Sequence, residues 1–190
     1  PATGSTFTGW LGACSGTGAC VVTMNAAKAV TATFTLNSYA LATATAGTGA
    51  GSVTLDPAGG LYSHCPLVTV AATPATGSTF TGWSGACAGT GSCVVTMDAA
   101  KAVTATFSLN GYPLTTATDG AGAGSVTLDP AGGTYSHGTV VTITNTPAAG
   151  SAFTGWSGAC AGTGTCVVTM DAAKAVTATF RLLVSSFDVS

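Results

Sequence analysis

Short runs of alternating apolar and polar residues recur along the chain and predict β-strands. In the segment 51–56, Val53 and Leu55 share one face while Ser52 and Thr54 share the other. The same alternation puts two further groups of side chains on common faces: Cys93, Val95 and Met97, then Val103, Ala105 and Phe107. No stretch of ten residues has the spacing of an amphipathic helix. The pattern therefore predicts an all-β or nearly all-β protein.

Turn residues separate these predicted strands. The sequence Asp-Pro-Ala-Gly-Gly occurs at 56–60 and again at 129–133, and it combines a proline that fixes φ with glycines that accept left-handed conformations. A further strand at 67–74 ends at Pro74. Between the two strands that flank it, the segment 98–101 is expected to form a four-residue hairpin connection. About six short strands are expected in each repeating unit.

The whole pattern repeats with a period of 73 residues. Trp10, Trp83 and Trp156 keep this spacing (83 − 10 and 156 − 83). Residues 1–38 differ from 74–111 at only six positions. We therefore expect residues 39–111 and 112–181 to be full repeats and 1–38 to be the C-terminal half of one. Residues 182–190 do not begin another repeat and are expected to be a tail or the start of another segment.

Charge is scarce, which excludes several classes of function. The chain has four Lys or Arg, six Asp and no Glu, so 5% of its residues are charged and the net charge is −2. A chain this poor in basic residues offers no patch for a phosphate backbone, and we expect no nucleic-acid binding. Apolar stretches are too short for a membrane-spanning helix, which needs roughly 20 apolar residues. We therefore expect no membrane span.

Six of the seven cysteines form three equally spaced pairs, which are Cys14/Cys20, Cys87/Cys93 and Cys160/Cys166. Five residues separate the members of each pair, a spacing that is poor for zinc without nearby histidines. Disulfides in an oxidising, extracellular or cell-surface environment are the expected state, and free buried thiols are the alternative. We expect no cofactor.

These motifs together resemble a known bacterial repeat family. The combination of Gly-Ser-Val at 124–126, the turn Pro-Ala-Gly-Gly-Thr-Tyr at 130–135, Phe-Thr-Gly-Trp at 153–156 and the ending at 170–180 is similar to divergent internalin-type B-repeats, which are related to Listeria–Bacteroides repeats. The resemblance covers residues 1–181. It implies tandem small β-grasp-like modules in bacterial surface or secreted proteins, which act as stalks, spacers or adhesive segments without shared catalytic residues.

The only two histidines occupy equivalent positions in the full repeats. His64 lies near Ser63 and Asp56, the residue types of a nucleophilic triad, and His137 is its counterpart. A turn residue bonded to the backbone is the expected role, because nothing in the sequence indicates an oxyanion site. A single histidine per repeat also cannot supply a metal site alone. We expect no catalytic and no metal-binding residue.

Two other repeated residue types admit a functional alternative. Trp10, Trp83 and Trp156 would suit stacking against sugar rings if exposed, but a core position beside the cysteine pair is the expected one. Lys28, Lys101 and Lys174 each follow an Asp or Asn by three residues in a tight turn. We expect solvated turn charges there and not covalent crosslinks.

Cys65 is the unpaired cysteine, and its counterpart in the next repeat is Gly138. An intermolecular disulfide and a residue without function are both consistent with it.

We therefore expect a non-catalytic extracellular structural protein that forms a stalk, an adhesin segment or a self-assembling filament. Its partners would be copies of itself, with a neighbour completing the half-repeat by strand addition. The alternatives are a module that binds a glycan or host surface, and a spacer attached to an enzyme elsewhere in a longer protein.

Overall fold

The computed structural model describes residues 1–183, and within that range it contains strands and no helix. The half-repeat has two strands, β1 (Ser5–Gly12) and β2 (Val30–Leu36). The first full repeat has seven, which are β3 (Ser38–Gly47), β4 (Gly51–Asp56), β5 (Leu61–Ser63), β6 (Leu67–Pro74), β7 (Ser78–Gly85), β8 (Cys93–Thr96) and β9 (Lys101–Leu109). The second also has seven: β10 (Gly111–Asp119), β11 (Gly124–Asp129), β12 (Thr134–Ser136), β13 (Val140–Pro147), β14 (Ser151–Gly158), β15 (Cys166–Thr169) and β16 (Lys174–Leu182).

The predicted all-β class and its tandem modules are confirmed. Each full repeat has one strand more than the expected six or so. At three residues, β5 and β12 are too short for alternation to signal them. Most of the predicted tail, residues 184–190, lies outside the residues that the structure describes.

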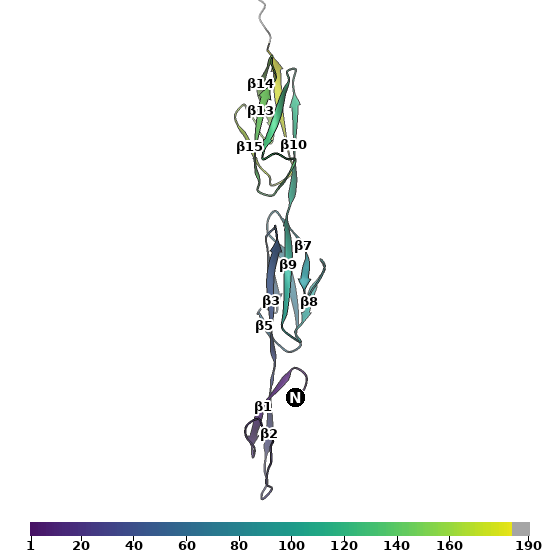
Figure 1. Cartoon of the computed structure of the whole chain (residues 1–190), viewed down its shortest axis with the longest axis vertical. Coiled ribbons are helices and arrows are strands. Elements are labelled where there is room, and N and C mark those ends of the chain that lie inside the picture. The colour runs from purple at the N-terminus through teal and green to yellow at the C-terminus, as the bar shows by residue number, and fades with distance from the viewer. Residues whose placement is uncertain (184–190) are drawn as a thin grey trace, which may run out of the picture. The chain divides into compact units, whose positions relative to one another are not determined.

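Each full repeat folds as two small sheets. In the first full repeat, the four-stranded sheet has the order β5-β3-β9-β7 and the three-stranded sheet the order β4-β6-β8. The first and last long strands, β3 and β9, are parallel neighbours, with Leu41 opposite Lys101 and Gly47 opposite Phe107 (Figure 1). Because these strands come from opposite ends of the repeat, their pairing closes the module on itself. The second full repeat has the same two sheets.

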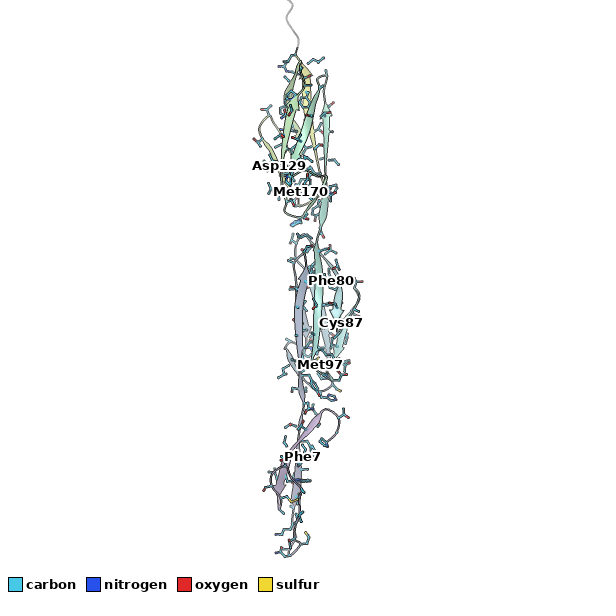
Figure 2. The ribbon with its side chains drawn as sticks, in the orientation of Figure 1. Phe7, Phe80, Cys87, Met97, Asp129 and Met170 are labelled. Atoms are coloured by element: carbon cyan, nitrogen blue, oxygen red, sulfur yellow. A yellow bond between two sulfur atoms is a disulfide. The ribbon has the colours of Figure 1, made fainter. Side chains whose placement is uncertain are left out.

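Residues that alternate onto one face of each strand form the core. In β9 the inward residues Val103, Ala105 and Phe107 are buried, and Val68 and Val70 of β6 face them. Figure 2 labels Phe80, Cys87 and Met97, which come from successive parts of this module. The second full repeat buries the same set one period later, including Met170 and Phe180. Each module therefore has a core of its own.

The expected hairpin at 98–101 is wrong. The strands that this turn connects lie in different sheets, since β8 pairs with β6 while β9 pairs with β3 and β7. Met97, the residue between β8 and this turn, has a fully buried side chain. The turn itself is closed by an ion pair between Lys101 and Asp98, with 2.8 Å between Nζ and Oδ1.

The half-repeat keeps its hairpin but lacks a closed core. β1 and β2 pair antiparallel, with Phe7 opposite Phe34 and Trp10 opposite Ala32. The side chain of Met24, whose equivalent Met97 is fully buried, is 71% exposed. Within residues 1–183, β2 pairs with β1 alone, whereas its counterpart β9 pairs with both β3 and β7.

The described chain divides into two compact units. The first comprises Pro1–Ala75 and Phe80–Ser108, and the second comprises Thr76–Thr79 together with the chain from Leu109 onward. The short turn Thr76–Thr79 thus belongs structurally to the unit that follows it in sequence. The reason lies in its contacts with His137 and Asn110, described below.

Candidate functional site

In each of the three repeats, a loop closed by a disulfide follows one strand, which is β1, β7 or β14. The three bonds are Cys14–Cys20, Cys87–Cys93 and Cys160–Cys166, each with 5.6 Å between the Cα atoms. These are the pairs that the spacing indicated. Cys93 and Cys166 are buried in the cores of their modules, so in the two full repeats the disulfide attaches a surface loop to the interior.

A tryptophan is held against each of these loops. The indole Nε1 of Trp83 donates a hydrogen bond to the carbonyl oxygen of Gly91 at 3.1 Å, and Trp156 bonds Gly164 in the same way at 3.0 Å. Phe80 packs on Trp83 with 4.9 Å between ring centroids. Trp83 and Trp156 are only 7% and 5% exposed, so neither offers a free ring face to a sugar. Their geometry is that of a core residue beside the disulfide.

An open cleft lies beside this tryptophan in both full repeats. In the first, β6 and the disulfide loop line a cleft of about 370 Å³ whose wall includes Trp83, Thr69 and Ser92. In the second, Trp156 and Asn145 border the equivalent cleft of about 250 Å³. Threonine and serine hydroxyls dominate the polar lining, and the cleft lining contains no ionisable side chain. Such a surface can accept hydrogen-bonding groups but cannot transfer protons near neutral pH.

The histidines pack against residues of the preceding repeat sequence. The imidazole of His64 lies 5.9 Å from the ring of Tyr39 and directly against Gly4, where a Cβ would overlap the ring. Its backbone N–H donates to the carbonyl oxygen of Asn37 at 2.8 Å. In the second unit, His137 contacts Tyr112 and Gly77 in the same manner. Both histidines are therefore structural contacts within their units.

The triad types around His64 are not assembled. The Nδ1 atom of His64 is buried without a hydrogen-bond partner, and so is that of His137. A catalytic histidine needs a carboxylate at one ring nitrogen and a nucleophile at the other. Neither Ser63 nor Asp56 bonds to it.

The sequence did not single out the two asparagines, Asn37 and Asn110, whose carbonyl oxygens accept the backbone N–H of His64 and His137. Asn37 donates its backbone N–H to the Gly4 carbonyl oxygen at 2.7 Å and accepts the Thr6 hydroxyl at 2.6 Å. Asn110 forms the same bonds with Gly77 and Thr79 in the second unit. The recurrence of Leu-Asn before each full repeat was the available signal. Alternation could not reveal its role, because Asn lies between strands.

Cys65 occupies a left-handed backbone position. Its φ is 72°, its N–H donates to the carbonyl oxygen of Met97 at 2.9 Å, and its thiol is exposed and unpaired. Gly138 has the same conformation, with φ 82°, and the same hydrogen bond to Met170. Glycine suits this position better, because a side chain is strained at such a φ.

In the two full repeats, the turn that contains the lysine is closed by an ion pair at the surface. Hydrogen bonding from Lys101 holds the pKa of Asp98 below its ordinary value of 3.8, and Lys174 does the same for Asp171. Asp98 and Asp171 are more than half exposed, so water screens these pairs. In the half-repeat, Asn25 replaces the acid, so its turn lacks that ion pair.

Residues 1–183 contain no cluster of three His, Cys, Asp or Glu side chains with the geometry of a metal site. Within the same range, no helix is long and apolar enough to cross a membrane.

The geometry defines a class of protein: tandem, disulfide-containing β-modules that repeat the same core. The sequence matches the family described as the divergent InlB B-repeat domain over residues 1–38, 41–111 and 114–182. The chain belongs to this family, which confirms the resemblance inferred from its motifs. No curated protein and no solved structure shows significant similarity to it.

Proposed function

We propose that these repeats are a non-catalytic, extracellular structural segment of a bacterial surface protein, in which successive modules act as a stalk. Membership of the divergent InlB B-repeat family supports a place at the bacterial surface. The disulfide in each repeat supports an oxidising compartment, because cytosolic thiols are kept reduced.

The observation that carries the proposal is that residues 1–183 repeat one core and repeat no cluster of ionisable side chains. Met97, Trp83 and Phe107 are buried in the first full repeat, and their counterparts at 170, 156 and 180 are buried equally in the second. Selection for a shared fold preserves such positions, whereas a catalytic site needs convergent ionisable groups. Each added module then contributes length and spacing.

Solution scattering on a series of chains tests this role. Chains containing one, two, three or four copies of residues 39–111 are expected to increase in maximum dimension by a constant increment per copy. Immunolabelling of intact cells of the source bacterium is expected to detect the repeats without permeabilisation. A maximum dimension that stops growing as repeats are added, or labelling that requires lysis, would contradict the stalk.

Glycan binding is a second candidate, and the recurrent cleft beside Trp83 and Trp156 favours it. The hydroxyls of Thr69 and Ser92 in the first cleft, and of Thr144 and Thr165 in the second, suit the hydrogen-bonding groups of a saccharide. Titration with soluble cell-wall and host-type oligosaccharides, followed by NMR of the indole N–H groups, separates the two candidates. Shifts confined to Trp83 and Trp156 would favour binding, and unchanged spectra would favour the stalk alone.

Self-assembly into a filament is the third candidate. Charged residues usually guard exposed strand edges, but β5 pairs with β3 only as far as Ala40, a bond from the Leu41 N–H to the Gly60 carbonyl oxygen follows, and β3 then has no charged residue from Ala42 to Gly47. Electron microscopy of the unreduced and reduced chain tests it, since an ordered filament would have to form without added partners.

A further inference from the structure

In each full repeat, the disulfide loop turns away from the neighbouring strand before that strand ends. β8 pairs with β6 from Leu67 to Val70, where Val70 lies opposite Cys93. β6 continues to Pro74 and stays paired with β4 on its other side. Among residues 1–183, β8 is the only strand beside this edge of β6, so the edge is open beyond Val70 and borders the cleft.

The alternation of backbone hydrogen bonds identifies the groups on this open edge. Just beyond β6, the Ala75 N–H donates to the Ala50 carbonyl oxygen. Antiparallel bonds recur at every second residue, so Ala71 bonds to β4 and Ala72 does not. The N–H and C=O of Ala72 therefore point to the opposite edge, toward the cleft. Within residues 1–183, no backbone hydrogen bond joins Ala72 to the disulfide loop.

The second full repeat has the same opening. β15 pairs with β13 only as far as Ile143, whereas β13 continues to Pro147. Just beyond β13, the Ala148 N–H bonds on the β11 side, and the same alternation then directs the N–H and C=O of Asn145 toward the cleft. Asn145 is the counterpart of Ala72, and both residues line their clefts. One backbone position in each full repeat thus presents a donor and an acceptor to the same cleft.

The cleft walls suit an extended, uncharged polypeptide. An open strand edge binds another backbone through its N–H and C=O groups. Phe80, which Figure 2 labels, and Trp83 contribute apolar surface to the first cleft, and Thr90 and Ser92 contribute hydroxyls. A charged side chain would find no opposite charge in either lining. Because the indole of Trp83 is buried and bonded to the loop, it offers no ring face to a sugar, which favours a polypeptide over a saccharide.

We propose that the clefts beside Trp83 and Trp156 are docking sites for an extended, uncharged segment of another polypeptide. This segment pairs through its backbone with Ala72 or Asn145 and continues the line of β8 or β15. Backbone hydrogen bonds supply the affinity, and every second side chain of the segment faces the tryptophan. The inference goes beyond the stalk function, because each full repeat then adds a docking site as well as length.

Amide hydrogen exchange of the free 190-residue chain tests whether the edge is open. Ala71 and Thr144 bond to the neighbouring strand, so their amide protons are expected to exchange slowly. The amide protons of Ala72 and Asn145 are expected to exchange roughly tenfold faster or more, because they face the cleft. Equally slow exchange at Ala71 and Ala72 would show that the edge is already closed and would overturn the proposal.

Titration with a synthetic peptide tests docking itself. The probe is a neutral peptide of alternating threonine and valine with blocked ends, and its control is the same peptide N-methylated at every residue, which keeps the side chains and removes the backbone donors. The probe is expected to slow exchange at Ala72 and Asn145 and to shift the indole signals of Trp83 and Trp156. No effect in probe excess, or an equal effect of the control, would overturn the proposal. So would a soluble oligosaccharide that shifts both indoles where the probe does not, because that result assigns the clefts to a glycan.

Two proline variants identify the backbone contact. Ala72→Pro removes the N–H on the open edge, and a strand tolerates proline where its N–H faces away from the ladder. It is expected to weaken probe binding at Trp83 by roughly tenfold or more and to leave binding at Trp156 unchanged. Asn145→Pro is the matched variant, with the opposite result expected. A retained indole signal shows that the altered module is folded, and the exchange test on the unaltered chain stands if it is not. Unchanged binding at the altered cleft would overturn the proposal.

Discussion

Substitution of the buried methionine is the sharpest test of how these repeats are stabilised. Met97 is fully buried between the two sheets of its module. Truncation of such a side chain removes its transfer free energy and leaves a cavity, at a cost of about 2–5 kcal/mol. For a module of this size, each kcal/mol lowers the melting temperature by about 4–8 °C. Met97→Ala is therefore expected to lower the melting temperature of the first full repeat by roughly 10 °C or more.

The matched control is Met24→Ala, which alters the same sequence motif where it is exposed. Because Met24 is 71% exposed, its truncation is expected to change stability by less than about 0.5 kcal/mol. Thermal melts followed through the indole N–H signals resolve each repeat, since every repeat has one tryptophan whose indole is hydrogen-bonded within its own loop. The Trp156 signal serves as an internal reference, because distant sites act independently. Equal losses for the two variants, or a loss at Trp156 as large as at Trp83, would refute the reasoning.

Three further substitutions test other parts of the module. The double variant Cys87→Ala/Cys93→Ala opens a disulfide loop whose ends are separated by 6 in sequence. The chain-entropy relation gives an expected destabilisation of about 2 kcal/mol for such a loop. Urea denaturation measures it, with the unchanged second full repeat as the reference. Cys65→Gly relieves a left-handed side chain and is expected to stabilise its repeat by about 1 kcal/mol in the same assay; a loss of stability would contradict the strain argument. Asp98→Asn removes a carboxylate whose pKa is lowered by Lys101, so its contribution is present above the unfolded pKa and lost as pH falls from about 3.8 through the lower folded value. NMR titration should place the Asp98 midpoint below 3.8 at low salt, and an unshifted midpoint would exclude the ion pair in solution.

Local pattern in the sequence determined much of this protein. Alternation identifies the strands and their inward faces, because side chains on a strand point to opposite sides in turn whatever the strand's neighbours are. It placed Met97 and Phe107 on the apolar faces of their strands, and both side chains are buried in the structure. The 73-residue period predicted the modules, and the equal spacing of the cysteines predicted disulfides that the structure contains.

Sequence could not predict which strands pair. The turn at 98–101 has the features of a hairpin, yet β8 and β9 belong to different sheets: β8 pairs with β6, whereas β9 pairs with β3 and β7. The parallel pairing of β3 with β9 joins residues about sixty positions apart, such as Leu41 and Lys101. Periodicity within one strand carries no information about such a partner.

For the candidate site too, the sequence indicated some features, and others arise only from the tertiary structure. The sequence indicated a buried tryptophan beside each disulfide, but the clefts beside Trp83 and Trp156 arise only when β6 and β13 lie against the disulfide loops. The packing of the His64 ring on Gly4 and its backbone hydrogen bond to Asn37 also join segments distant in sequence. Met24 and Met97 show the limit most directly, since nearly identical sequences surround them. One is exposed and the other fully buried, because burial depends on strands supplied from elsewhere and not on the motif itself.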